Sequence, residues 1–295
     1  MHQRGPFLVL FIAIATVFAG CGSSSDSGSS SKSASANANR PQAKRVANVP
    51  GAQLVQPQHL TMCSDIPNPP QEFYDEQGDL QGSDIDTGNG IAARLGLQPV
   101  WVNSVFDTII EAVKAGKCDI IVSGQNITPE RLKQVEMIPY FSAGQTFVVK
   151  KGNPEGVTND PMRLCGKTLA VQLGALEQQT AEGFSRKCAA AGKPTIKILV
   201  AQKTSDALQQ VQTSHAAGFF QDSPIVSYYV RQQPQLFEAA GGVIAPVAEG
   251  ISVPKEKPAL GAGVKAALKS MENDGTYKKI LERWGLGDIT VPLIG

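Results

Sequence analysis

From residue 60 onwards the sequence alternates short apolar segments with amphipathic ones, the pattern of strands followed by helices. The expected strands of a first series are 60–63, 99–103, 119–122 and 145–150, and the expected helices are 84–95, 106–115 and 129–136. A second series follows, with strands at 168–171, 197–200 and 217–220, and helices at 176–190, at 204–212 and from Ser223. Such alternation predicts an α/β fold with mainly parallel sheets and helices on both faces. The chain then returns through a strand at 250–254 and a helical region at 260–284, interrupted at Gly275.

The turn before the third expected helix carries a cation in an unfavourable place. Thr128 is a good N-cap and Pro129 suits the first helical position, so Arg131 falls in the first turn. There the helix dipole opposes a positive charge by roughly 0.3–1 kcal/mol. Guanidinium is matched to a carboxylate through two parallel hydrogen bonds, which makes Arg131 a candidate ligand contact. The alternative is an exposed arginine paired with Glu130.

The N-terminus reads as an export signal. Arg4 precedes an apolar core at 7–18, and Ala19-Gly20-Cys21 closes it. The small residues before Cys21 resemble a lipobox, although Phe18 replaces the usual leucine. We therefore expect a lipoprotein signal peptide at 1–20, a lipidated Cys21 and a flexible tether at 21–51, which would hold the protein at a membrane outside the cytoplasm. The alternative is ordinary secretion with cleavage elsewhere.

Composition excludes several classes of function. The net charge of +1, from 27 basic and 26 acidic residues, gives no reason to expect nucleic acid or an anionic membrane surface as partner. No second apolar run reaches membrane-spanning length. His59 and His215 stand alone and no Cys-x-x-Cys occurs, so we expect no metal and no cofactor. After Cys21 four cysteines remain, and an even number in an exported protein favours disulfides.

Six segments in the right order resemble the solute-binding proteins of ABC-type polar amino-acid importers. These are 78–86, 106–110 with 115–120, 127–131 with Pro139-Tyr140, 165–171, 250–255 and 273–285. The resemblance runs from about residue 60 to 286. It implies a type II periplasmic-binding-protein fold, in which two lobes are joined by two crossover strands and the ligand is held between them. The implied division is 52–150 with 250–288 for lobe 1, 151–249 for lobe 2 and 289–295 for a C-terminal tail.

The resemblance implies roles for individual residues at the backbone end of an amino acid. Arg131 would bind the α-carboxylate, with Gly124 and Asn126 beside it and Ser123 adjoining. Asp222 would take the α-ammonium, because each buried charge needs a partner. The alternative for Asp222 is an acid at a helix start, favoured by the dipole.

Other matched positions would read the ligand's side chain. Asp65 would contact donor groups, and Phe106 would form an apolar wall. The remaining contacts would come from Asn68 and Gln71 in place of aromatics, from Gln172 and Gln221 as side-chain readers, and from the backbone around Gly174. The cleft is thus rich in acceptors and offers no second cation, so glutamate and aspartate should bind poorly. We expect glutamine, with lysine or arginine as second choice.

The resemblance further implies a monomer that delivers a free amino acid to a membrane permease. Two alternatives remain: an enzyme resembling cyclohexadienyl or arogenate dehydratases, and a ligand-sensing domain. The first needs an acid placed to protonate a leaving hydroxyl, and we expect no cleft carboxylate beyond Asp65, Glu72 and Asp222. Sensors of this fold usually continue into a transmembrane segment, which we do not expect here. A binding protein without catalysis is the favoured interpretation.

We predict a disulfide between Cys165 and Cys188, which bracket the first strand and helix of the second lobe. Cys63 and Cys118 would form the remaining pair, near the ends of two strands that we expect to be neighbours. A parallel register could offset these two cysteines too far for sulfur contact.

Overall fold

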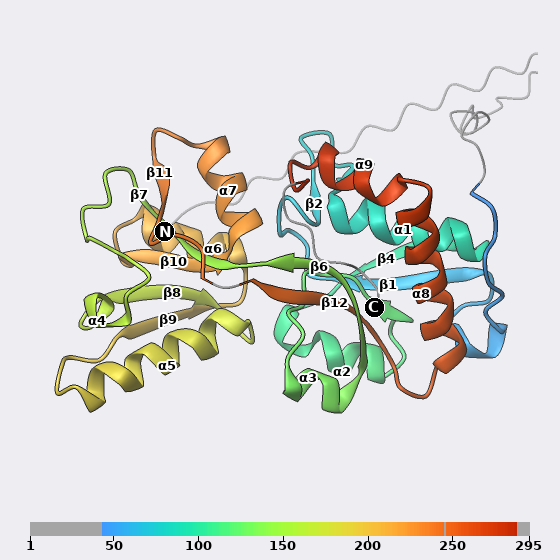
Figure 1. The fold of residues 1–295 in the computed structure, drawn as a ribbon, viewed down its shortest axis with the longest axis horizontal. Coiled ribbons are helices and arrows are strands. Elements are labelled where there is room, and N and C mark those ends of the chain that lie inside the picture. Colours follow the sequence, from blue (N-terminus) through green and yellow to red (C-terminus); the bar gives the residue numbers. More distant parts are fainter. Residues whose placement is uncertain (1–42, 245, 288–295) are drawn as a thin grey trace, which may run out of the picture. The chain divides into compact units, whose positions relative to one another are not determined.

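A computed structural model describes residues 43–244 and 246–287. Within this part, two five-stranded sheets are each flanked by helices, and a two-stranded ribbon joins β2 (Phe73–Tyr74) to β3 (Leu80–Gln81) (Figure 1). The two sheets form the cores of two lobes, as the resemblance predicted. Among the described residues no helix is both long and apolar enough to cross a membrane.

The first sheet has its parallel strands at one side and an antiparallel pair at the other. In order, its strands are β4 (Gln98–Asn103), β1 (His59–Ser64), β5 (Ile120–Ile121), β12 (Val247–Val253) and β6 (Glu136–Ala143). Its helices are α1 (Ser83–Leu95), α2 (Ile109–Lys114), α3 (Pro129–Gln134), α8 (Pro258–Asn273) and α9 (Thr276–Arg283), with 3-10 turns at Gly51–Gln53 and Phe106–Thr108. Leu60 and Met62 of β1 pack with Ile91 and Leu95 of α1 in the core, where none of the four is exposed.

The second sheet is built from the middle of the chain. In order, its strands are β11 (Phe237–Ala240), β7 (Gln145–Lys150), β10 (Gly218–Asp222), β8 (Thr168–Gln172) and β9 (Lys197–Ala201). Its helices are α4 (Pro161–Leu164), α5 (Leu176–Ala190), α6 (Thr204–Gln212) and α7 (Ser223–Gln232). In its core the rings of Phe147 and Phe220 stack with centroids 4.5 Å apart.

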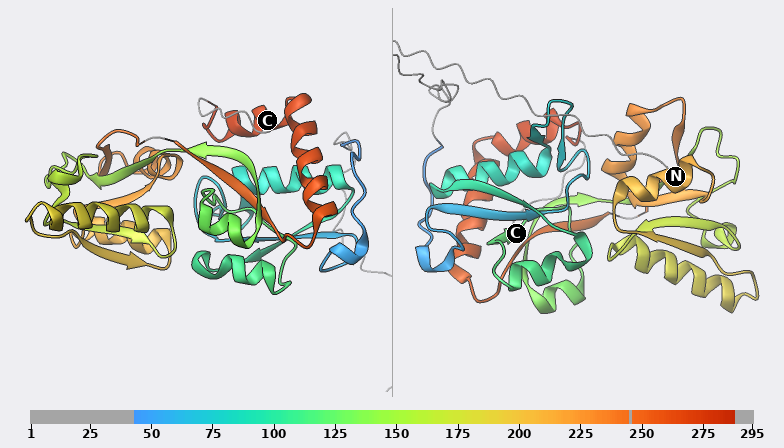
Figure 2. Two further views of the ribbon diagram at one scale, coloured as in Figure 1. Left: turned by 60° about the horizontal axis from the view of Figure 1, so that its bottom comes forward. Right: turned by 180° about the vertical axis from the view of Figure 1, so that it is seen from behind.

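The chain passes between the sheets twice, at neighbouring points. β6 leads through Gly144 into β7, and the return runs from β11 to β12, which pairs antiparallel with β6 (Figure 1 and Figure 2). The two passages touch at Gly144, where an added Cβ would lie 2.2 Å from Cγ1 of Val243 and 2.4 Å from the carbonyl oxygen of Ile244. A side chain at position 144 would therefore force the two crossovers apart.

Several expected boundaries are corrected by these pairings. β7 belongs to the second sheet, so the first crossover lies at Gly144, before the expected boundary at residue 150. The helix expected at 129–136 ends at Gln134, because Val135 is already extended and β6 follows. Neither β6 nor β11 was predicted. The expected tether at 21–51 is too long, since Val49 is buried in the first core.

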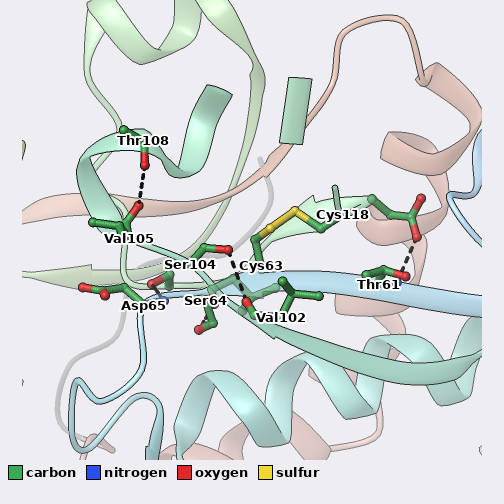
Figure 3. The surroundings of a disulfide bond; sticks show 12 residues. Thr61, Cys63, Ser64, Asp65, Val102, Ser104, Val105, Thr108 and Cys118 are labelled. Carbon is green, nitrogen blue, oxygen red and sulfur yellow. Dashed lines mark hydrogen bonds between the residues drawn. A yellow bond between two sulfur atoms is a disulfide. The ribbon is translucent and has the colours of Figure 1, made fainter. Parts of the chain in front are cut away.

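Both predicted disulfides are present in the structure. Cys63 and Cys118 have Cα atoms 5.7 Å apart, and Cys165 and Cys188 have theirs 5.5 Å apart, both within the usual range. Cys63 lies in β1, and Cys118 comes just before β5, so the parallel register does not separate them (Figure 3). The signal peptide at 1–20, Cys21 and the tail at 289–295 lie outside the described residues.

Candidate functional site

Polar side chains from both lobes meet where β1, β5, β8 and β10 end. The cavity there is lined by Asn68, Phe106, Gly124, Asn126, Gln172, Ala175, Glu177, Gln221, Asp222 and Ile225. Its volume of about 10 Å³ suits a single water molecule, so the lobes must separate to admit an amino acid. A cavity of about 390 Å³, lined by Lys150, Lys167 and His215 among others, lies at the opposite end of the second sheet and contains none of the predicted site residues.

Arg131 is buried at the junction of the lobes, with 9% of its surface exposed. Thr128 caps α3 by accepting a hydrogen bond from the Arg131 backbone N–H, as predicted. The guanidinium donates to the carbonyl of Asn126 through Nη1 at 2.7 Å and, across the cleft, to the carbonyl of Gly174 through Nη2 at 3.0 Å. Its Cζ lies 5.3 Å from the centroid of the Phe106 ring. Burial lowers the pKa of Arg131, and nearby carboxylates oppose that shift.

Asp222 faces this guanidinium from the second lobe. It ends β10, begins α7 and is 4% exposed. Its side chain contacts those of Glu177 and Asn126, and its Oδ1 finds no hydrogen-bond donor among the described residues. Burial raises the pKa of Asp222 well above its ordinary value, and the carboxyl groups of Glu177 and Glu249 raise it further.

A second group of polar contacts links the lobes around Asp65. Gln172 of β8 donates through Nε2 to Oδ2 of Asp65 at 2.5 Å, and the Thr204 hydroxyl lies 3.1 Å from Oδ1 of Asn68. Burial raises the pKa of Asp65 to about 6, although the hydrogen bond from Gln172 opposes the shift. Gln221, by contrast, uses its Oε1 to accept from the backbone N–H of Asp222.

Ser123 and Gly124 are held by carboxylates within the first lobe. The Ser123 hydroxyl donates to Glu72 Oε1 at 2.7 Å and accepts from the backbone N–H of Asp65 at 2.9 Å. The Gly124 backbone N–H donates to Oδ2 of Asp84 at 2.9 Å. Both groups thus position the loop, and the Gly124 N–H is engaged with Asp84 and not turned to the cavity. Gly174, in the left-handed conformation with φ of 76°, offers its carbonyl to the cleft.

Sequence reasoning missed two acids of the cleft. Contrary to our expectation of no further cleft carboxylate, Glu177 lines the cavity and is 1% exposed, and Glu249 is completely buried beside Gln71, whose Nε2 donates to its Oε2 at 2.8 Å. Glu177 stands in the first turn of a correctly predicted helix, where an acid is ordinary. Glu249 stands just before the segment predicted as a strand. The one local signal for Glu249 is that an acidic residue adjoins an apolar segment that is expected to be buried.

The cleft is strongly acidic. Two buried carboxyl groups, from Glu177 and Asp222, line the cavity, and four more lie behind its loops or beside it, from Asp65, Glu72, Asp84 and Glu249. Among the described residues the buried cations are Arg94, which pairs with Asp274 elsewhere, and Arg131. One guanidinium cannot balance six carboxylates in a medium of low dielectric, so protons or a cationic ligand must supply the missing positive charge.

Several proteins with known names resemble this chain. ABC transporter arginine-binding protein 1 of Escherichia coli (strain K12) is 27% identical over 221 residues, which cover 73% of this chain and 86% of that protein. The structure of an ancestral arginine-binding protein bound to arginine is 34% identical, with a TM-score of 0.72, and covers 77% of this chain and 98% of its own. The structure described as an ancestral arginine-binding protein bound to glutamine is 35% identical, with a TM-score of 0.71, and the match covers 78% of this chain and 98% of that one.

These proteins are named for binding and not for catalysis, which supports the binding interpretation over the dehydratase alternative. The similarity extends through both lobes and includes the segments that form the cleft. Residues 60–287 match the profile of the bacterial extracellular solute-binding proteins, family 3, and the chain belongs to that family.

Proposed function

We propose that this protein captures an L-amino acid with a cationic side chain between its lobes and delivers it to an ABC-type permease. The observation that carries the proposal is that Asp222 lines a buried cavity from the second lobe, while Arg131 of the first lobe lies next to that cavity, against its lining residues Asn126 and Phe106. A zwitterion bound there would give its carboxylate to the guanidinium and its ammonium to the aspartate, so that each buried charge gains a partner.

The charge around Asp65 favours a cationic side chain. Asp65 is the charged group among its cleft neighbours Asn68, Gln172 and Thr204, and burial raises its pKa because the hydrogen bond from Gln172 and the charge of Lys203 give the ionised form only partial compensation. A guanidinium or ammonium group on the ligand would supply the missing positive charge, whereas the amide of glutamine would leave the charge of Asp65 unbalanced. This argument, with the arginine named for the relatives, moves our preference from glutamine to arginine or lysine.

Glutamine remains the second candidate. The amide groups of Asn68 and Gln172 can exchange hydrogen bonds with a ligand amide, and one similar protein is described as bound to glutamine. Glutamate and aspartate would add another carboxylate to an acidic cleft and should bind poorly.

The proposal includes the place where the protein acts. A signal peptide at 1–20 and a lipidated Cys21 would hold a monomer on the outer side of the cytoplasmic membrane, near its permease. The family to which the chain belongs is described as extracellular, which supports this location.

A thermal-shift screen of the twenty amino acids tests the ligand class, because a ligand that binds only the folded protein raises its melting temperature with concentration. We expect L-arginine and L-lysine to give the largest shifts and L-glutamine a smaller one. Calorimetry then gives the affinities. Glutamate or aspartate as the tightest ligand would contradict the proposal, and turnover of prephenate or arogenate would replace it with the enzyme alternative.

A further inference from the structure

Two carboxyl groups of the second lobe face each other in the cleft. Glu177 comes from the first turn of α5, and Asp222 ends β10. Their side chains lie within hydrogen-bonding reach of one another, and they are 1% and 4% exposed. Water therefore has little access to either group.

Two ionised carboxylates cannot hydrogen-bond to each other, since both only accept. Glu177 Oε1 and Asp222 Oδ1 have no donor among the described residues. The amides of Asn126 and Gln145 face the pair, yet their nitrogen atoms complete no hydrogen bond of good geometry there. A proton on one of the two carboxyl groups would let that acid donate a hydrogen bond to the other.

The charged groups around the pair do not remove the need for that proton. Arg131 of α3 favours ionisation, but its guanidinium is hydrogen-bonded to main-chain carbonyls instead of to either carboxyl group. The carboxyl group of Glu249 in β12 opposes ionisation of Asp222. Burial raises the pKa of both Glu177 and Asp222, consistent with a retained proton.

We propose that Glu177 and Asp222 share one proton before the ligand binds and release it when the α-ammonium of the amino acid takes its place. The ammonium then donates to both carboxylates, and the displaced proton passes to solvent. This inference rests on the proposed function, since it assigns the α-ammonium to Asp222, and it adds Glu177 as a second anionic contact. Capture of the amino acid is therefore linked to pH. At pH values below the one at which the pair loses its proton, affinity increases about tenfold for each unit by which the pH is raised.

A measurement on the protein alone tests the shared proton. Carboxyl groups labelled with ¹³C report their protonation by NMR, and we expect one protonated carboxyl group assigned to this pair at pH 7.5. Glu177→Gln should remove that signal, and so should Asp222→Asn. The use of two separate substitutions guards against the case in which one variant fails to fold. Glu182→Gln is the matched control, because Glu182 lies on the same helix and accepts a hydrogen bond from Gln178. Ionised carboxylates at both positions at pH 7.5 would overturn the proposal.

Calorimetry with L-arginine at pH 7.5 tests the exchange. Titrations in phosphate and in Tris, whose ionisation enthalpies differ, give the number of protons released, which we expect to be about one for the natural protein and for Glu182→Gln. Glu177→Gln should release close to none. Arginine binding without proton release would overturn this inference and leave the proposed function standing. Failure to bind arginine, or any other amino acid, would instead count against the proposed function, while the NMR measurement still decides on the shared proton.

Discussion

The guanidinium of Arg131 on the first lobe donates to the main-chain carbonyl of Gly174 on the second, with 3.0 Å between Nη2 and the oxygen. A bound carboxylate would be a stronger acceptor than this carbonyl, because it carries a charge. The closed arrangement thus keeps the buried guanidinium hydrogen-bonded. Opening the cleft breaks this contact and frees Nη2 for a ligand.

Replacement of Arg131 by alanine should greatly weaken the binding of every amino acid, because it removes the partner of the α-carboxylate that they share. Loss of one partner from a buried, charged hydrogen bond costs about 2–5 kcal/mol, so we expect affinity to fall by at least thirtyfold. Calorimetry with L-arginine and L-lysine measures the loss. Lys133→Ala, an exposed change on the same helix, is the control. An Arg131→Ala protein that keeps its affinity would remove Arg131 from the site.

Asp65→Asn should change ligand preference. It keeps an acceptor for Gln172 but removes the charge that would pair with a cationic side chain. We expect affinity for L-arginine to fall about tenfold or more, while affinity for L-glutamine changes less than threefold. Competition binding of the two ligands measures the ratio. Glu111→Gln, which removes an exposed carboxylate from α2, should leave the ratio unchanged. An equal loss for both ligands would contradict the assigned role.

The stability of the protein without ligand should depend on the ionisation of Asp65. Its pKa is raised from 3.8 to about 6 by burial, so the folded protein binds this proton more tightly than the unfolded chain does. The stabilising contribution is complete below about pH 4 and is lost as pH rises through about 6. Asp65→Asn should therefore gain stability relative to the natural protein across this window, by at most about 3 kcal/mol. Urea unfolding at pH 4 and pH 7 measures the difference, and a gain confined to the lower pH would contradict the assigned sign.

Both disulfides should stabilise the protein, the longer loop more. The sequence separations are 55 for Cys63–Cys118 and 23 for Cys165–Cys188, which correspond to about 4 and about 3 kcal/mol in the chain-entropy model. Replacing each pair by serine and measuring unfolding in denaturant tests this order. Mass mapping of the non-reduced protein checks the pairing itself, and free thiols at all four positions would contradict it.

Cys21→Ser should release the protein from membranes without changing its affinity for amino acids, because the site residues all come later in the chain. Cell fractionation followed by calorimetry on the released protein measures both effects. A Cys21→Ser protein that stays with the membrane fraction would count against a lipid anchor.

The fold could be predicted from the sequence because its elements keep their local signals. The helices at 176–190 and 204–212 have the predicted bounds, since apolar spacing and flanking turns agree there. β6 was missed because it contains Pro139, which donates no hydrogen bond, and because it follows a helix without a glycine stop. Its strand form comes from pairing with β12, a segment more than a hundred residues later.

The site was only partly predictable. Arg131 could be recognised because a first-turn cation conflicts with local electrostatics, and such conflicts point to function. Glu177 gives no such signal, because an acid in the first turn of a helix agrees with the helix dipole. It becomes unusual only because β10 places Asp222 beside it, and no local pattern records that contact.

The position of β12 between β5 and β6 bears on the order in which the lobes can form. The strands of the second sheet span a continuous stretch from Gln145 to Ala240, so they can pair as soon as that stretch is available. The first sheet keeps an open gap until Val247–Val253 arrives and fills it. A chain delivered from its N-terminus therefore begins the first lobe, completes the second, and closes the first only near its end. Until then, the unpaired edges of β5 and β6 are where a nascent chain could join a wrong partner.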